Sequence, residues 1–323
     1  MISETETVLD RRKMRRSVTF WRSAAILALA LAVGAYIFGS DKLAEYAGTK
    51  HIARVSIEGT ITESRQQLKM LKKIADSKNA AALIVFVNSP GGTTSGGEAL
   101  YEALREVSKK KPVVAQFGTV AASAGYIVGL GSDHIVARGN TITGSVGVII
   151  QWPEVAELLS RFGVKVNEVR SGELKAIPSP FQPLDEAGRR ITKEMVADSN
   201  KWFQSIVEER RGIRIAEVPG LDQGRIYSGR EAQRMKLVDE IGGEGEAIKW
   251  LEEKKGIKKD LKVVDWKPAS DRSLGALGVA SSGLVETVLG SGAGRLAELL
   301  SRDRTVSVLG LDGLVSVWHP GEN

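Results

Sequence analysis

Apolar residues after position 50 form short runs that alternate between two kinds of spacing. Segments 51–59, 81–87 and 112–117 have the length and apolar content of strands, and the run AALIVFV at 81–87 is typical of a strand covered on both faces. Segments 66–76 and 96–109 lie between them and have helical spacing. The alternation predicts an α/β fold built from βαβ units with a mostly parallel sheet.

The same rhythm continues further along the chain. Segments 134–138, 146–150 and 164–170 are predicted strands, and 154–162 and 185–211 are predicted helices. On the long helix we expect one apolar side, formed by Ile191, Met195, Trp202, Phe203 and Ile206. No internal repeat is apparent, which indicates a single-unit protein.

An uncharged apolar segment at 23–39 precedes this domain, and at 1.5 Å per residue a helix there reaches roughly 25 Å. We interpret it as an uncleaved membrane anchor. The alternative is a secretory signal, but Tyr36, Ile37 and Phe38 occupy the region where a small-x-small cleavage site would stand. The basic residues of 11–16 precede the segment, so we expect a cytoplasmic N-terminus in the inner membrane and a periplasmic remainder.

The chain is thereby divided into five predicted parts. They are a basic cytoplasmic N-terminus at 1–22, the transmembrane anchor at 23–39, a connector at 40–50, a folded domain at 51–266, and a Gly/Ser-rich C-terminal extension at 267–323. We assign no fold to the last part.

Composition excludes several kinds of chemistry. The formal net charge is +6, but the densest basic run stands beside the anchor, so we expect a membrane and no nucleic acid as its partner. The chain has no cysteine, which excludes disulfides and a cysteine nucleophile. Its histidines, His51, His134 and His319, are not near a Gly-flanked serine, so a Ser-His-Asp triad is improbable. Without HExxH or Walker patterns, we expect no metal and no cofactor.

Three small-residue motifs stand at or near the carboxyl ends of predicted strands. They are NSPGG at 88–92, VAASAGY at 120–126 and TGSVG at 143–147. Crevices form at such strand ends, and glycines there expose backbone N–H groups to a ligand. We place Ser123 in the first turn of a helix that begins near Ala121, where it could act as a nucleophile. The alternative is that these small residues only permit close helix packing.

The motifs together resemble a known family. NSPGG followed about thirty residues later by AAS-x-GY is similar to the nucleophile and oxyanion arrangement of the Clp protease and signal peptide peptidase A families. SGELK at 171–175 is similar to the S-G-x-x-K of the latter, and the stretch 224–242 also fits it. The matches span roughly 51–266, and they imply a Clp protease/crotonase-like fold.

The resemblance also implies roles for individual residues. Ser123 would be the nucleophile, Lys175 the general base, and Ser145 the hydroxyl that orients the lysine amine. The oxyanion hole would be formed by the backbone N–H groups of Gly92 and Ala124, next to Gly91.

Lys175 carries the strictest physical requirement. An ordinary lysine, with a pKa of about 10.4, is protonated at neutral pH and must be desolvated to act as a base. Leu174 and Ile177 beside it are apolar, whereas Glu173 would oppose the change. An exposed loop lysine is the alternative reading.

The function that follows is a membrane-anchored serine endopeptidase that degrades remnant signal peptides and needs no cofactor. By the same resemblance the chain forms a homo-oligomer in which one subunit donates the serine and its neighbour the lysine. Alternatives are a related membrane peptidase that cleaves another membrane-protein segment, a crotonase-type acyl-CoA enzyme, and a catalytically silent scaffold.

Overall fold

The computed structural model describes residues 20–22, 24, 49–268 and 315–317. Residues 50–268 and 315–317 belong to one compact unit. The predicted anchor at 23–39 lies outside the described residues except for Ala24, as does nearly all of the extension after residue 268. Within the described ranges, no helix combines the length and apolar character needed to cross a bilayer.

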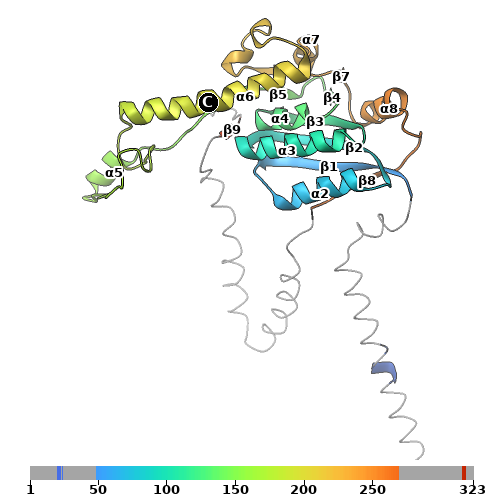
Figure 1. The fold of residues 1–323 in the computed structure, drawn as a ribbon, viewed down its shortest axis with the longest axis horizontal. Coiled ribbons are helices and arrows are strands. Elements are labelled where there is room, and N and C mark those ends of the chain that lie inside the picture. Colours follow the sequence, from blue (N-terminus) through green and yellow to red (C-terminus); the bar gives the residue numbers. More distant parts are fainter. Residues whose placement is uncertain (1–19, 23, 25–48, 269–314, 318–323) are drawn as a thin grey trace, which may run out of the picture. The chain divides into compact units, whose positions relative to one another are not determined.

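A mixed, mostly parallel sheet forms the centre of this unit (Figure 1). Its strands are β1 (His51–Ile61), β2 (Ala80–Thr93), β3 (Val113–Ala122), β4 (His134–Ala137), β5 (Ile142–Gly144), β6 (Ile226–Ser228), β7 (Glu240–Ile241), β8 (Val263–Asp265) and β9 (Val315–Val317). The order is β6-β5-β3-β2-β1-β8, with β4 between β3 and β7 and with β9 beside β2. Only the β5–β6 and β2–β9 pairs are antiparallel among the described strands. The predicted α/β fold is confirmed.

Several of the helices begin at a capping side chain. They are α2 (Arg65–Asp76), α3 (Thr94–Ser108), α4 (Ala124–Leu130), α5 (Ala156–Arg161), α6 (Glu186–Arg211), α7 (Gly229–Arg234) and α8 (Glu244–Lys255). Ser64, Thr93 and Asp185 each accept a hydrogen bond from a backbone N–H in the first turn of α2, α3 and α6. Gly212 ends α6 in the left-handed conformation, with φ 61°.

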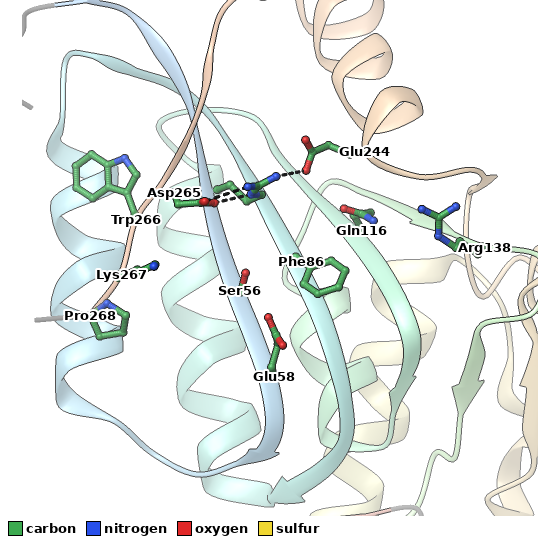
Figure 2. Close-up of a pocket in the computed structure, with 11 residues that line it drawn as sticks. Ser56, Glu58, Phe86, Gln116, Arg138, Glu244, Asp265, Trp266, Lys267 and Pro268 are labelled. Carbon is green, nitrogen blue, oxygen red and sulfur yellow. Dashed lines mark hydrogen bonds and ion pairs between the residues drawn. The ribbon is translucent and has the colours of Figure 1, made fainter. Parts of the chain in front are cut away.

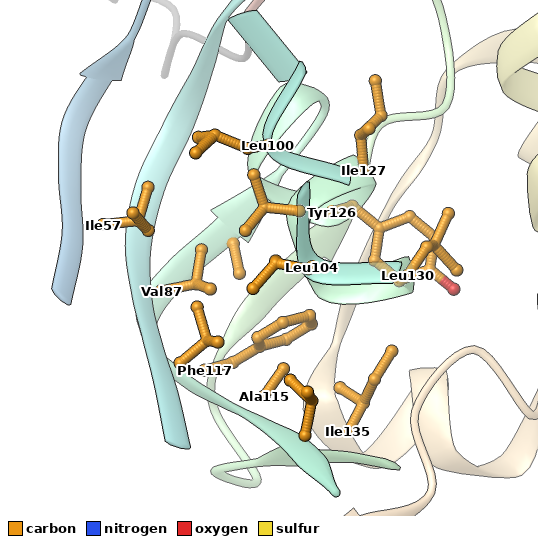
Figure 3. Packing of buried hydrophobic residues seen from close by; sticks show 14 of the residues in the cluster. Ile57, Val87, Leu100, Leu104, Ala115, Phe117, Tyr126, Ile127, Leu130 and Ile135 are labelled. Carbon is orange, nitrogen blue, oxygen red and sulfur yellow. The ribbon is translucent and has the colours of Figure 1, made fainter. Parts of the chain in front are cut away.

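The sheet buries its two faces against different helices. Along β1, Ala53, Val55 and Ile57 lie in the core beneath α2 and α3, while Ile52 packs on the other face with residues of α8. Figure 3 shows the larger core, in which Phe117 and Tyr126 meet edge to face at 6.3 Å. Burial raises the pKa of Tyr126 above its ordinary value.

Two strands are longer than the apolar pattern predicts. β2 does not stop at NSPGG but continues to Thr93, and β3 continues to Ala122. Pro90 is tolerated inside β2 because the pairing with β1 shifts there, from Asn88 opposite Glu58 to Gly91 opposite Thr60. A residue without a backbone N–H fits such an irregular position in the ladder.

The predicted strands at 146–150 and 164–170 are wrong. In the first segment only Ile149 makes an isolated bridge, and the regular strand is β5, which precedes it. The second segment has no regular structure and is exposed, with Val169 fully accessible. It belongs to residues 151–182, which we call the arm. Figure 1 shows α5, within the arm, at the end of α6 away from the sheet, where no neighbouring strand offers a ladder.

Helix α6 packs on the core with only part of its length. Phe203, Ile206 and Val207 are buried, and Trp202 is partly buried against the core. Met195 is 50% exposed. The predicted continuous apolar side therefore packs in the second half of the helix and is accessible in the first half.

Candidate active site

The three motifs meet where β2, β3 and β5 end. These strands are neighbours in the sheet, and β3 is parallel to both of the others. The backbone N–H of Ser123, just after β3, donates to the carbonyl oxygen of Gly144 at 2.9 Å, and the N–H of Ser145 donates to Arg225 at 2.9 Å. The sheet thus places TGSVG directly against the candidate nucleophile.

Close contacts that only glycines permit place NSPGG at the same point. A Cβ on Gly125 would lie 2.7 Å from the carbonyl oxygen of Ser89, and a Cβ on Gly92 would lie 1.8 Å from that of Ile61. Real Cβ atoms do not approach backbone oxygens so closely. The start of α4 therefore contacts β2 because Gly125 lacks a side chain, and the end of β2 contacts the end of β1 because Gly92 lacks one.

Ser123 has an unusual backbone. Its φ of 57° and ψ of −120° lie outside the regions that non-glycine residues ordinarily adopt. Its N–H is held by Gly144, and its carbonyl oxygen accepts hydrogen bonds from Tyr126 and Ile127 at 2.9 and 3.0 Å. Strained residues that the surrounding structure fixes in this way cluster at functional sites.

The position of Ser123 relative to its helix differs from the prediction. Ala121 and Ala122 are the last residues of β3, and α4 begins only at Ala124. Ser123 is therefore the N-cap residue and not part of the first turn. Its side chain makes no capping hydrogen bond. The strand is extended because β5 supplies partners for Ala121 and Ala122.

A cavity of about 500 Å³ opens beside Ser123, which is itself only 1% exposed. It is lined by Ser123, Ser145, Val146, Gly147, Val148, Ile149, Lys193, Val196, Ala197, Asn200, Asp222, Gln223 and Gly224. Ser145 lines the same cavity as Ser123, and it too has a positive φ, of 52°. We call this space the serine cavity.

The predicted oxyanion residues are also near the nucleophile. Ala124 follows Ser123 directly, while Gly91 and Gly92 lie at the end of β2, against which Gly125 packs. All three are buried, and none lines the serine cavity. Their backbone, and not a side chain, is what they can offer to a substrate carbonyl.

Lys175 does not join this cluster within one chain. It lies in a turn of the arm, where its N–H donates to the Gly172 carbonyl at 3.1 Å, and it is exposed. It does not line the serine cavity. The sequence motifs pair Ser123 with Lys175, but within a single chain the two members of the predicted dyad are apart.

Sequence reasoning missed Lys193, Asn200 and Asp222. Lys193, Val196, Ala197 and Asn200 are spaced i, i+3, i+4 and i+7 on α6, so they share one face. Polar residues at both ends of an otherwise apolar helix face are a detectable signal. It could not be assigned to the site, because nothing in the sequence tells which element that face meets.

The two described histidines are engaged elsewhere. His51 stacks on Trp266, whose Nε1 lies 3.1 Å from His51 Nε2, and His134 stacks on Trp250 with ring centroids 4.6 Å apart. Neither lines the serine cavity. His319 lies outside the described residues.

A second cavity, of about 620 Å³, lies on the sheet face that α8 covers only in part (Figure 2). Arg54 spans it with hydrogen bonds to Asp265 at 2.5 and 3.0 Å and to Glu244 at 2.6 Å. These bonds hold the pKa of Asp265 below its ordinary value. Ser123 does not line this cavity. We assign it no role in catalysis.

Known protein families match this chain in two overlapping regions. The model of peptidase family S49 matches residues 105–258, and the Clp protease model matches residues 51–139. The second match agrees with the observed α/β architecture, which is Clp-protease-like. Together the two regions include every candidate catalytic residue named above.

Three bacterial relatives with protease names match most of this chain. A candidate protease of Synechocystis is 35% identical over 67% of this chain and 78% of its own length. A candidate signal peptide peptidase SppA of Enterococcus faecium is 33% identical over 70% of each chain. Protease 4 of Haemophilus influenzae is 32% identical, but the match spans only 38% of its length.

These matches decide between the enzyme classes that the sequence left open. They support the protease prediction and give no support to a crotonase-type acyl-CoA enzyme. The buried, strained serine at the meeting point of three motifs is consistent with a serine-dependent member of such a family. The chain belongs to peptidase family S49 and is a serine protease.

Proposed function

We propose that this protease uses Ser123 and Lys175 as a catalytic dyad, is anchored in the membrane through residues 23–39, and degrades remnant signal peptides. The observation that carries the proposal is Ser123 itself. It is held at φ 57° by fixed hydrogen bonds, at the ends of three neighbouring strands and at the wall of a cavity. An attacking oxygen needs a fixed position beside a space that the substrate can enter.

The chemical step is acyl transfer. Lys175 accepts the proton of the Ser123 hydroxyl, whose oxygen attacks the substrate carbonyl and forms a tetrahedral oxyanion. The N–H groups of Gly92 and Ala124, with Gly91 shaping the turn, stabilise that oxyanion, and Ser145 orients the lysine amine. The amine returns its proton to the leaving nitrogen, and water then hydrolyses the acyl-enzyme.

The dyad is completed between subunits. Lys175 is exposed on the arm and does not line the serine cavity of its own chain, which supports its supply by a second copy. The arm also exposes large apolar side chains, namely Leu158, Phe162, Val164, Val166, Val169, Leu174 and Phe181. Monomeric proteins rarely expose such a group, and burial in a neighbouring copy would desolvate Lys175 as its role requires.

The substrate is an extended peptide. β9 pairs antiparallel with the last residues of β2 and places Ser316 opposite Gly92, which supports the capacity of this end of β2 to pair with an added strand. The serine cavity has apolar walls formed by Val146, Val148 and Val196. Apolar peptides such as signal peptides fit it, and an anchor at 23–39 would hold the site near the bilayer on the periplasmic side.

A serine-reactive fluorophosphonate probe tests the dyad. We expect wild-type labelling, and a loss of at least a hundredfold in labelling rate in Ser123→Ala and Lys175→Ala. Lys193→Ala is the matched control, since Lys193 is the lysine that lines the serine cavity of the same chain. If Lys193→Ala abolishes labelling while Lys175→Ala does not, the assigned base is wrong.

Mixing inactive chains tests the sharing of the dyad. Co-assembled Ser123→Ala and Lys175→Ala chains should regain peptidase activity, because some sites then combine an intact serine with an intact lysine. No recovery from chains that demonstrably co-assemble would contradict the shared site.

The substrate assignment is tested by the products. Mass spectrometry should detect cleavage of a synthetic signal peptide within its apolar core. Cleavage of a membrane-protein segment in strong preference to signal peptides would favour the alternative peptidase instead.

A further inference from the structure

The segment of the arm that carries Lys175 is tied together at its two ends. Residues 171–181, which we call the lysine loop, lie between Arg170 and Gln182. With the Gln182 amide turned so that both its oxygen and its nitrogen are satisfied, the oxygen accepts hydrogen bonds from Arg170 Nη1 and Nη2 at 2.7 and 2.6 Å. One guanidinium therefore joins the residue before the loop to the residue after it.

Arg170 is itself held by a second partner. Its Nε donates to Glu168 Oε2 at 2.8 Å, and its Nη2 also donates to that oxygen. The Arg170 side chain is 17% exposed, whereas that of Arg161 on α5 is 72% exposed. The planar guanidinium can bind a carboxylate and an amide oxygen at once in a fixed geometry, which a lysine ammonium does not reproduce.

Other contacts attach the lysine loop to its surroundings. The Pro180 carbonyl oxygen accepts a hydrogen bond from the Val155 N–H at 2.8 Å. A Cβ on Gly188, in the first turn of α6, would lie 2.4 Å from Cγ2 of Ile177, so Ile177 packs directly on that helix. Lys175 is thus exposed to solvent, but it stands on a loop whose ends are fixed.

The fixed ends serve no purpose inside the serine cavity of the same chain, because neither Arg170 nor Gln182 lines it. We infer that Arg170 is a positioning residue, which joins the two ends of the lysine loop so that Lys175 is presented to Ser123 of a neighbouring copy. The inference rests on the proposed shared dyad. A reacting group that is misplaced by about 1 Å can cost a hundredfold in rate, so a loop that reaches another subunit gains from such a tie.

Charge compensation is the competing explanation for Arg170. With Glu168, Glu173 and Asp185 it lines a cavity of about 420 Å³ in the arm. Among the described residues that line this cavity, Arg170 is the one basic residue. A lysine would compensate these carboxylates equally well, but it would not join the loop ends. Arg170→Lys therefore separates the two explanations.

Steady-state kinetics of the full chain test the role of Arg170. Arg170→Met should lower kcat roughly thirtyfold with KM within about twofold, because the loss falls on the chemical step and not on substrate binding. Arg170→Lys should remain within about threefold of Arg170→Met. Arg161→Met, which removes the exposed arginine of α5, is the matched control and should keep kcat within about twofold.

Gln182→Leu breaks the same tie from its other end. It should lower kcat as Arg170→Met does, and the double variant should lose no more than about twofold beyond the weaker single variant. An unchanged kcat in Arg170→Met, full activity in Arg170→Lys, or fully additive losses would overturn the inference.

Mixed chains show which subunit needs Arg170. The reference is co-assembled Ser123→Ala chains, which supply the lysine, and Lys175→Ala chains, which supply the serine. Arg170→Met added to the Ser123→Ala chain should lower the recovered activity at least tenfold. Added to the Lys175→Ala chain, it should change that activity less than about twofold, because the lysine loop of that chain is not used.

Light scattering should show the same assembly in both mixtures. If Arg170→Met prevents assembly, Gln182→Leu is placed in the same two chains. No recovery in the reference mixture would contradict the shared dyad, whereas recovery with equal losses in both placements would contradict the role of Arg170.

Discussion

The end of the sheet that carries Ser123 and the arm that carries Lys175 differ in almost every physical respect. Around Ser123 the residues of β3 and α4 are buried, and hydrogen bonds and glycine contacts fix the backbone. The arm has one short helix, α5, with no buried residue, and it exposes Phe162 and Val169. The first region is complete within one chain, whereas the second lacks the packing that would cover its apolar side chains.

Under the proposed dyad, this difference separates what the folding of one chain achieves from what assembly would add. A nucleophile needs a fixed position, which the sheet supplies locally through neighbouring strand ends. A lysine base needs desolvation, which an exposed arm does not supply by itself. Substitutions that act on one region and leave the other unchanged test this difference between the two regions.

The largest effect is expected from a charge on the arm. Phe162→Asp places a carboxylate where we expect an apolar contact with a second copy, and it should lower kcat/KM by a factor of ten to a hundred, roughly 1.4 to 3 kcal/mol. Phe162 is 77% exposed, so the melting temperature of the single domain should hardly change. Size-exclusion chromatography with light scattering should show loss of assembly.

Ser160→Asp is the control, because it adds the same charge to an exposed polar position of α5. If Phe162→Asp lowers neither assembly nor activity, the arm is not an interface between copies.

A smaller effect is expected from one added methyl group in the rigid region. Gly125→Ala would place Cβ 2.7 Å from the Ser89 carbonyl oxygen, so β2 and α4 must separate. We expect a loss of roughly 1 to 3 kcal/mol in the free energy of unfolding, together with reduced activity. Urea denaturation monitored by circular dichroism measures it.

The same substitution in the arm is the matched control. A Cβ on Gly172 would meet no atom within 4 Å. Gly172→Ala should therefore change the free energy of unfolding by less than about 0.5 kcal/mol. Equal losses at both positions would remove the contrast between a packed region and an exposed one.

The smallest effect is expected from an ion pair far from both regions. Arg54 lowers the pKa of the Asp265 carboxyl. The pair therefore stabilises the fold at pH values above the unfolded-state pKa of about 3.9. This stabilisation is lost as the pH falls through the lower pKa of the folded state. Both side chains are partly exposed, which limits the contribution to about 1 kcal/mol or less. Arg54→Met should reduce stability at pH 7 and much less at pH 2, in urea titrations.

Arg161→Met in the arm provides the comparison. The Arg161–Glu157 pair is more exposed, at 72% and 80%, and its loss should be nearly undetectable at either pH. A larger effect of Arg161→Met than of Arg54→Met would indicate that the arm is packed and not free.

Much of the fold could be predicted from the sequence, including helix α5 of the arm, but the backbone of 164–170 could not. Apolar runs such as 81–87 identify buried strands because two covered faces require side chains of one kind. The alternation in 164–170 resembles a strand equally well, yet no neighbouring strand pairs with it. The periodicity of apolar residues indicates which side chains are suited to burial. It does not indicate whether a neighbouring strand is present to form hydrogen bonds with the backbone.

The candidate site divides in the same way. From the sequence, the motifs and the family that they resemble pointed to Ser123, Ser145 and the glycines of the strand ends, because each of these lies within a short segment of its own. Only the tertiary structure brought Asn200 and Lys193 of α6 to the serine cavity and left Lys175 outside it. The physical reason is that the residues at a strand end fix its local conformation themselves. The surface that a helix face or an arm contacts depends instead on packing between elements that are distant in the sequence.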